Sequence, residues 1–545
     1  MKKLTVIAVL LLSACTTPTP QPQDDAPTQA QAAVSPDAFR AHVNFLASDL
    51  LEGREAGTRG YDIAAAYVAT QFELMGLSPA GDNGSFMQSV PLRASWREAD
   101  RIRLALQQDG SRTELTFKQD FLLRNAPQRT EAVVEAETVF VGYGIDAPNR
   151  GHNDYDGLDV RGKVAVVLTG YPAGWPSEEG AFYSSGATKS RTAEAHGAIA
   201  MIYVYTDAIE KVSPWERMTR NPDAMAMSWV GKDGVPHSSA PSIRLSGIVT
   251  ADVGNALFEG APLSYSEVRK QAVDGAPAGF PLSVRLDMAA GSRQEDRTSA
   301  NVAGMVIGTD PALRNEHVVL TAHLDHLGIG PPVDGDAINN GALDNAAGIA
   351  AMLEAARSLQ ADPPRRSVIF LAVTAEEKGL LGSEYFALNP TVPIDAIVAN
   401  VNLDMPVLLY DFKDLIGFGA THSSIEGTMR DALASMGLGL SPDPFPERAI
   451  FVRSDHFRFV QQGVPSIMLA TGSTSSEGEG KGLEVFIEFL TTHYHRPSDD
   501  PSRPIDYAAG MRFGEVNYRL LKAIANADEA PTWNEGDFFG ERFGR

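Results

Sequence analysis

The sequence predicts an α/β fold in which a mainly parallel central sheet is sandwiched by helices and interrupted by a β-rich insert. Between residues 299 and 525, apolar runs typical of buried strands alternate with helical patterns. Residues 131–289 instead hold short apolar runs among Gly, Pro and Asn, which indicates a separate β-rich unit. We therefore expect a discontinuous α/β domain over residues 36–130 and 290–530, with residues 531–545 as a C-terminal tail.

Apolar spacing predicts the individual elements. Ser35 and Pro36 form the N-cap and first turn of one helix. A second helix is stopped by Gly76, and its apolar residues at helical spacing are Ile63, Tyr67, Val68, Phe72 and Met75. The strands expected in the insert are TVFVGYGI, KVAVVL and AIAMIYVY. The strands expected in the α/β domain are HVVLTAH, SVIFLAVTA, AIVANVNLD and GVPSIMLA, with AGIAAMLEAARSLQ as a helix.

The first 15 residues have two lysines, a short apolar stretch and the small-residue end of an export signal. The segment Leu12-Ser13-Ala14-Cys15 resembles the lipobox of bacterial lipoproteins, which implies acylation of Cys15; the alternative is a chance cysteine near an ordinary cleavage site. Residues 16–35 are rich in Pro, Gln and Thr and predict a disordered tether. We expect an exported lipoprotein on the periplasmic face, held in the outer membrane through Cys15, because Thr16 rather than Asp follows it.

The composition excludes several classes of site and partner. Forty-six basic against 69 acidic residues give a net charge of −23, which argues against nucleic acid and anionic membrane surfaces as partners. Cys15 is the single cysteine of the chain, so disulfides and thiolate zinc sites are excluded. Any metal ion must be held by His, Asp and Glu.

Candidate metal ligands follow three of the predicted strands, at the edge where open α/β sheets bind their ligands. His323 closes the first strand, the pair Glu376-Glu377 follows the second, and Asp404 follows the third. Asp344 lies at the start of the helix between them, where its simplest alternative role is a helix cap. Three carboxylates about 5 Å apart repel by roughly 10 kcal/mol in total at an effective dielectric near 20, and divalent cations remove that cost.

Three carboxylates and two imidazoles suit two zinc ions, each with one histidine and one acid, with Asp344 as the bridge. The second imidazole comes from THYHRPSDD, where spacing leaves His493 and His495 both open. Asp325 lies two residues after His323, on the same side of an extended chain, and is expected to orient that imidazole. Of Glu376 and Glu377, one binds metal and the other faces substrate; a solvated acidic pair is the alternative.

Five motifs, AHLDHLG, NGALDNAAG, AEEKGLLGS, NLDM and YHRPSDD, together resemble family twenty-eight of the metallopeptidases. These are di-zinc aminopeptidases related to glutamate carboxypeptidase and the transferrin receptor. The resemblance covers nearly the whole exported chain. It implies a zinc-peptidase fold similar to phosphorylases and hydrolases, with the insert as a protease-associated (PA) domain.

The resemblance also implies a role for each residue of the metal site. It places His323 and Asp404 on one zinc, Glu377 and His495 on the other, Asp344 between them, Glu376 as general base and Asp325 as orienter. It further implies a cis peptide bond between Asp344 and Asn345.

The function that follows is zinc-dependent hydrolysis of peptides by a metal-bridging hydroxide, with peptides as the expected partners. We expect an aminopeptidase, in which Asp455 holds the substrate ammonium and His456 steadies the oxyanion. A carboxypeptidase, in which Arg453 clamps a carboxylate, is the alternative. A glutaminyl cyclase with one zinc and a non-catalytic binding lipoprotein remain as further alternatives. The residues leave the oligomeric state open.

Overall fold

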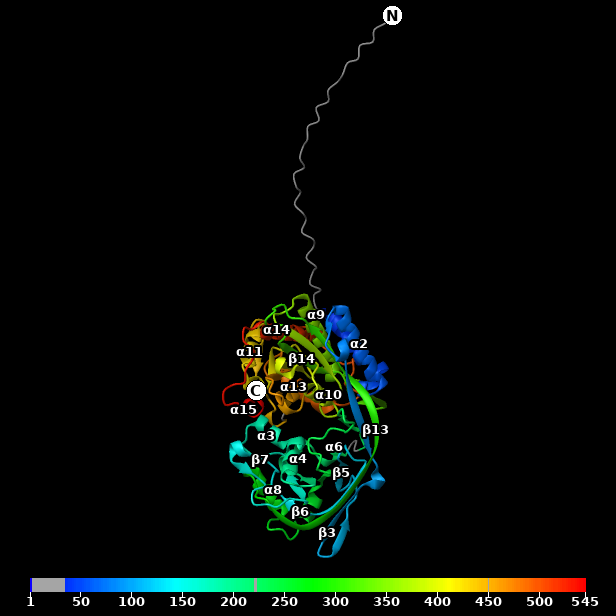
Figure 1. The fold of residues 1–545 in the computed structure, drawn as a ribbon, viewed down its shortest axis with the longest axis vertical. Helices are drawn as coiled ribbons and strands as arrows, with labels where there is room; N and C mark the ends of the chain where they lie inside the picture. Colours follow the sequence, from blue (N-terminus) through cyan, green and yellow to red (C-terminus); the bar gives the residue numbers. More distant parts are fainter. Residues whose placement is uncertain (2–34, 220–222, 449) are drawn as a thin grey trace.

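The computed structural model describes residue 1 and residues 35–219, 223–448 and 450–545. The predicted signal peptide with Cys15, and the tether as far as residue 34, lie outside the described residues. The described chain folds into two parts that lie end to end in Figure 1, with strand β13 (Phe280–Val306) running along both. None of the helices within the described ranges combines the length and the hydrophobicity needed to cross a bilayer.

The first part is built on a mixed sheet whose four central strands are parallel. Its strand order is β11-β2-β13-β17-β14-β18-β21-β19-β20. These strands are β2 (Met87–Arg97), β11 (Ala226–Trp229), β14 (His317–His323), β17 (Ser367–Val373), β18 (Ile397–Leu403), β19 (Asp414–Phe418), β20 (Gly439–Ser441) and β21 (Ser466–Thr471). The central strands β14 and β17 are buried at every residue, as strands covered on both faces must be.

Helices cover both faces of this sheet, which confirms the predicted fold class. One face carries α1 (Pro36–Leu46), α2 (Arg59–Met75), α9 (Ala347–Ala361), α11 (Ile425–Ala434), α13 (Lys481–Thr492) and α14 (Tyr507–Asn526). The other face carries α10 (Leu381–Leu388) and α12 (His456–Val460). The predicted ends of the first helices are confirmed, because the Ser35 side chain caps α1 and Gly76 ends α2 with φ 77°.

Helix α9, which the sequence predicted, is buried on all sides along its first ten residues. Every residue from Ala347 to Ala356 is buried, including Glu354, whose carboxylate lies 3.3 Å from Nε2 of His42 in α1. Five alanines and Gly348 keep this part of the helix narrow. The helix therefore fits between the sheet and the layer formed by α1, α2 and α14.

The second part has its own sheet and its own core. Its strand order is β4-β3-β13-β6-β9-β10-β12-β5. The strands are β3 (Arg103–Gln108), β4 (Ser111–Glu114), β5 (Phe121–Asn125), β6 (Glu131–Phe140), β9 (Val164–Leu168), β10 (Ala200–Val204) and β12 (Leu245–Val249). Its longer helices are α3 (Ser177–Ser184), α4 (Gly186–Ala195), α7 (Ala251–Leu257) and α8 (Tyr265–Asp274). Strands β3 to β5 precede residue 131, so the packing of this part begins earlier in the chain than the expected insert.

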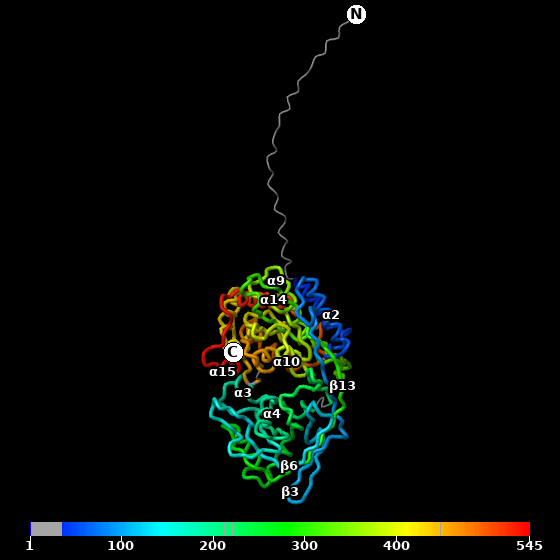
Figure 2. Tube along the Cα trace, in the orientation of Figure 1, coloured from blue at the N-terminus to red at the C-terminus, as the bar shows by residue number. Residues whose placement is uncertain are grey.

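The C-terminal segment packs at the junction of the two parts. Helix α15 (Phe538–Phe543) places Phe539, which is fully buried, against Phe182 of the insert and against Phe451 and Phe457 of the α/β part. Figure 2 shows this segment, in red, ending beside α3. Residues 538–543 therefore belong to the folded core, whereas the sequence analysis expected a tail there.

Candidate metal centre

Three neighbouring parallel strands end at the same level and deliver the candidate ligands. In the register of the sheet, His323 at the end of β14 lies opposite Val373 at the end of β17, and Ala322 lies opposite Leu403 at the end of β18. Glu376 and Glu377 follow β17, and Asp404 follows β18 directly. The carboxyl edge of the sheet thus gathers the side chains that the sequence predicted there.

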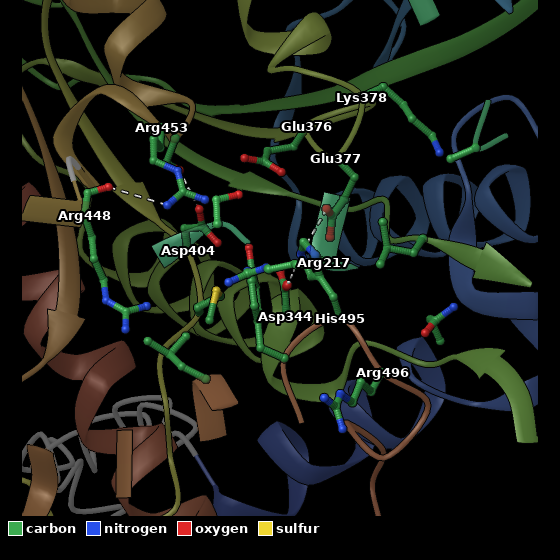
Figure 3. Close-up of a pocket in the computed structure, with 18 of the residues that line it drawn as sticks. Arg217, Asp344, Glu376, Glu377, Lys378, Asp404, Arg448, Arg453, His495 and Arg496 are labelled. Carbon is green, nitrogen blue, oxygen red and sulfur yellow. Dashed lines mark hydrogen bonds and ion pairs between the residues drawn. The ribbon is translucent and has the colours of Figure 1, made fainter. Parts of the chain in front are cut away.

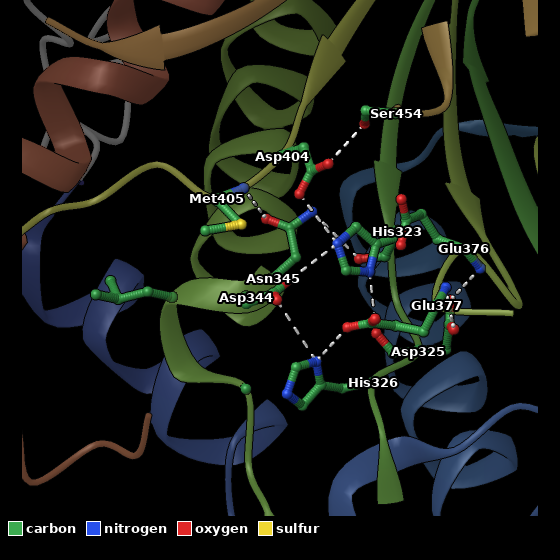
Figure 4. Close-up of polar contacts among 12 residues, drawn as sticks. His323, Asp325, His326, Asp344, Asn345, Glu376, Glu377, Asp404, Met405 and Ser454 are labelled. Carbon is green, nitrogen blue, oxygen red and sulfur yellow. Dashed lines mark hydrogen bonds and ion pairs between the residues drawn. The ribbon is translucent and has the colours of Figure 1, made fainter. Parts of the chain in front are cut away.

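The first group of ligand atoms consists of His323, Asp344 and Asp404, all of them buried. Nε2 of His323 lies 3.1 Å from Oδ1 of Asp344 and 3.2 Å from Oδ1 of Asp404 (Figure 4). The other oxygen of Asp404 accepts a hydrogen bond from the Ser454 hydroxyl at 2.6 Å. Oδ1 of Asp404 is therefore left to face the imidazole.

The second group uses the other oxygen of Asp344. Nε2 of His495 lies 3.3 Å from Oδ2 of Asp344 and 3.2 Å from Oε2 of Glu377. His493, the alternative that spacing left open, instead contacts Ser498 and Glu488. Asp344 thus presents one oxygen to each histidine, which is the arrangement expected of a bridging carboxylate.

The separations between these atoms fit zinc. Two ligand atoms of one tetrahedral zinc, with bonds of 2.0–2.1 Å, are about 3.3 Å apart. The four imidazole–carboxylate distances of the two groups lie between 3.1 and 3.3 Å. The nitrogen and oxygen donors of both groups therefore fit zinc.

The loop that carries Asp344 is fixed by its backbone. The N–H groups of Leu343 and Asp344 each donate to the buried carboxylate of Asp499, at 3.0 Å. The side-chain amide of Asn345 donates to the carbonyl of Leu403 at 2.8 Å, at the end of β18. The peptide bond between Asp344 and Asn345 is cis, as the family resemblance implied. Asp344 is therefore held from both sides before any cation binds.

The predicted role of Asp325 needs a correction. Nδ1 of His323 lies 3.0 Å from the backbone carbonyl of Asp325, whereas the Asp325 carboxylate accepts hydrogen bonds from the N–H groups of Glu376 and Glu377. The expected contact required an extended chain, but β14 ends at His323. The carboxylate of Asp325 therefore anchors the loop that carries both glutamates, and its main chain orients the imidazole.

The charges of the cluster perturb one another strongly. Burial alone would lower the pKa of His323, but Asp404 and Asp344 raise it well above its ordinary value. Burial alone would raise the pKa of Asp344, but its imidazole neighbours hold it well below the ordinary value. Burial raises the pKa of Glu376 well above the ordinary range, and the carboxylate of Asp404 adds to this shift. A buried cluster of this kind favours cations among its acids.

The cluster opens into a large cavity between the two parts, with a volume of about 1560 Å³. Glu376, Glu377, Asp344, Asp404 and His495 all line it (Figure 3). One wall is apolar and consists of Phe418, Ile450, Met468, Ala470, Phe486 and Leu490. The basic residues of the lining are Lys211, Arg217, Lys378, Arg448, Arg453 and Arg496. Side chains from the insert, including Arg217, therefore face the same space as the metal centre.

Of the three residues expected to bind substrate, only Arg453 lines this cavity. Asp455 and His456 have no exposed surface, because α12, which follows Asp455, packs against the sheet. Burial lowers the pKa of His456 to about 3, so its imidazole is neutral. The expected roles of Asp455 with a substrate ammonium and of His456 with the oxyanion stay predictions that the cavity lining does not support. Two residues that the sequence did not single out also contact the cluster. Ser454 donates to Asp404, and Asp499 accepts from the backbone N–H of Asp344.

The comparisons with known proteins agree with this geometry. Residues 301–521, which carry every ligand of both groups, match the description "Peptidase family M28". The similarity to M28 peptidases thus falls on the segment that carries the candidate ligands. The match does not extend to residues 131–289, so their assignment as a PA domain remains a prediction.

Similar proteins include several aminopeptidases. The chain is 34% identical to the probable leucine aminopeptidase 2 of Aspergillus oryzae over 203 residues, which are 35% of this chain and 37% of the relative. It is 27% identical to aminopeptidase NAALADL1 of Mus musculus, over 39% of this chain and 26% of the relative. These matches thus span well under half of each relative. The solved aminopeptidase from Aneurinibacillus sp. strain AM-1 is 20% identical and shares the fold, with a TM-score of 0.53 over 92% of this chain and 96% of that one.

Proposed function

We propose that this protein is a zinc-dependent exopeptidase, and specifically an aminopeptidase that removes N-terminal residues from peptides. One observation carries the proposal: Asp344 presents one carboxylate oxygen to His323 and the other to His495, at 3.1 and 3.3 Å. Two zinc ions that share Asp344 are the arrangement that these distances support best. The relatives from Aspergillus oryzae and Mus musculus are named as aminopeptidases, which supports the substrate class.

The chemistry divides between the metal ions and Glu376. Zinc at these residues would polarise the carbonyl of the scissile bond and make a water molecule easier to deprotonate. Glu376 lines the cavity and is not needed as a ligand by either group. Its carboxylate takes the proton from the attacking water and passes it to the amine nitrogen as the carbon–nitrogen bond breaks. The neighbouring apolar wall accommodates the side chain of the residue that is released.

Glu376→Gln tests this division directly. We expect turnover to fall by about 10²–10⁴-fold, because general acid–base catalysis contributes that much, while zinc content measured by mass spectrometry is unchanged. Glu55→Gln is the matched control, since Glu55 also lines the cavity but forms an ion pair with Lys378 at 2.7 Å. Normal turnover in Glu376→Gln would contradict the assignment.

The basic residues of the cavity favour a carboxypeptidase as the second candidate. Arg448, Arg453 and Arg496 line the cavity and could hold the carboxylate of a substrate C-terminus. Peptides with a blocked N-terminus or a blocked C-terminus separate the two activities, and a chelator control shows that hydrolysis needs metal. An aminopeptidase cleaves only peptides with a free N-terminus.

Two further alternatives differ in metal content or in chemistry. A single-zinc glutaminyl cyclase would bind one zinc ion per chain, and a binding lipoprotein would bind two without hydrolysing any peptide amide. Metal analysis of the purified protein, combined with the same peptide library, distinguishes both from the proposed enzyme.

The proposal includes export and acylation at Cys15, which the lipobox-like sequence supports. Labelling of cells with a radioactive fatty acid should mark the wild-type protein and leave Cys15→Ser unlabelled. Equal labelling of both proteins would contradict the lipid anchor.

A further inference from the structure

A third imidazole lies at the second group of ligands, and the proposed chemistry does not use it. His326 has no exposed surface, and its Nδ1 lies 2.7 Å from Oε1 of Glu377 and 3.9 Å from Oδ2 of Asp344. Its ring centroid is 5.8 Å from that of His495. Figure 4 shows His326 facing Asp344 and Glu377 from the side opposite Asp404.

The distances separate His326 from the metal ligands. The other imidazole–carboxylate pairs lie at 3.1–3.3 Å, close to the separation of about 3.3 Å between two ligands of one tetrahedral zinc. The ion-pair contact of His326 with Glu377 is shorter, at 2.7 Å, whereas Nδ1 of His326 lies 3.9 Å from Oδ2 of Asp344, which is longer than the separation of two ligands on one tetrahedral zinc. His326, Asp344 and Glu377 are close enough to form a candidate metal group, but the distances favour His326 as a partner of Glu377 over a ligand of the same ion.

The two oxygens of Glu377 have different neighbours. Oε2 lies 3.2 Å from Nε2 of His495, on the side where the second metal is expected, while Oε1 lies 2.7 Å from Nδ1 of His326. An N–H at Nδ1 of His326 would occupy Oε1. One oxygen of Glu377 is then left for the metal, so the carboxylate is restricted to binding through a single oxygen.

The surroundings of His326 hold its ring in place. Its backbone N–H donates to the carbonyl of Arg54 at 3.2 Å, and a Cβ at Gly341 would lie 2.7 Å from two atoms of the imidazole. The buried guanidinium of Arg54 donates to the carbonyls of Leu324 and Asn340 on either side. The ring therefore has little freedom to turn away from Glu377.

We propose that His326 is a positioning residue, which holds Glu377 in one-oxygen coordination and thereby sets the affinity of the second metal site. This inference rests on the proposed two-metal function. Partners that orient metal ligands in this way typically change metal affinity by 10–100-fold when they are removed. His326 should accordingly affect the metal held by Glu377 and His495 and leave the one held by His323 and Asp404 unchanged.

The test measures metal binding without reference to activity. Metal-free wild type, His326→Ala, His326→Asn and His495→Ala are titrated with Zn²⁺ in competition with a chelator, and with Co²⁺, whose absorption spectrum reports coordination. His493→Ala is the matched control, because His493 contacts Ser498 and Glu488 away from the cluster. Circular dichroism shows whether each variant is folded.

We expect His326→Ala to keep the first dissociation constant and to raise the second by about 10–100-fold. His326→Asn should recover most of the lost affinity, because its side-chain amide can donate to Oε1. An unchanged second constant in His326→Ala would overturn the proposal. The proposal would also be overturned if His326→Ala lost the second metal as completely as His495→Ala and His326→Asn did not recover it. His326 would then be a ligand itself. A wild type that binds a single metal ion would instead contradict the proposed function.

Discussion

Replacing His422 by glutamine should remove a pH-dependent part of the protein's stability between about pH 6 and 9.5. His422 joins three segments, because Nε2 lies 2.5 Å from Oε2 of Glu178 in the insert and Nδ1 lies 2.5 Å from Oδ2 of Asp537 in the C-terminal segment. Burial alone would lower the pKa of His422, but its hydrogen bonds to Asp537 and Glu178 raise it to about 9. The imidazolium is thus an ionic link between the two parts of the molecule.

The size of the effect follows from the shift. An ordinary histidine pKa of 6.5 and a folded value of about 9 differ by about 2.5 units, which corresponds to about 3 kcal/mol of stability. Because the folded pKa is raised, this contribution is complete below about pH 6.5 and is lost as the pH rises through 9. About 2 kcal/mol remains at pH 7.5, and almost none above pH 10.

Urea unfolding followed by tryptophan fluorescence measures this dependence at about pH 6, 7.5 and 9.5, at a fixed zinc concentration. His422→Gln should lose most stability at pH 6 and nearly match the wild type at pH 9.5. His493→Gln serves as the control, since its imidazole contacts the exposed side chain of Glu488 on the surface. A difference between wild type and His422→Gln that stays constant over this range would refute the reasoning.

Two further predictions concern stability. A chelator should lower the melting temperature, and added zinc should restore it. Ions that bind only the folded chain stabilise it by about 4 kcal/mol at 1,000 times their dissociation constant. A melting temperature that changes with neither chelator nor zinc would contradict a metal centre. Phe539→Ala should destabilise the protein by about 3–5 kcal/mol in urea unfolding, because the buried ring packs between the two parts; Phe543→Ala, which removes a partly exposed ring, should cost much less.

The sheet of the α/β part was predictable because its strands are short apolar runs with acidic or imidazole side chains just beyond their ends. Parallel neighbours end at one edge, so positions far apart in the sequence could be assigned to one place, as for His323, Asp404 and Glu377. The structure brings these ligands together with Asp344 and His495.

Sequence patterns do not predict side-chain contacts where the chain leaves regular structure. Alternation of side chains along a strand does not extend past its last residue, so the carboxylate of Asp325 was assigned the wrong partner. Left-handed backbone occurs at three positions of the site, with φ values of 54° at Ala375, 50° at Met405 and 59° at His495. Such backbone changes the direction of neighbouring side chains, and sequence spacing does not predict that direction. His326 lies within the AHLDHLG motif, yet spacing gives no sign of its contact with Glu377, which follows another strand.

Strand β13 places a mechanical limit on how the cavity can change its width. Along residues 292–302 it is paired with β2 at eleven consecutive positions, and it continues without a break from the insert into the α/β part. Widening the cavity must therefore bend a two-stranded ribbon, because β13 and β2 stay paired along this connection. The width of the cavity is thus tied to the shape of a paired ribbon that both parts share.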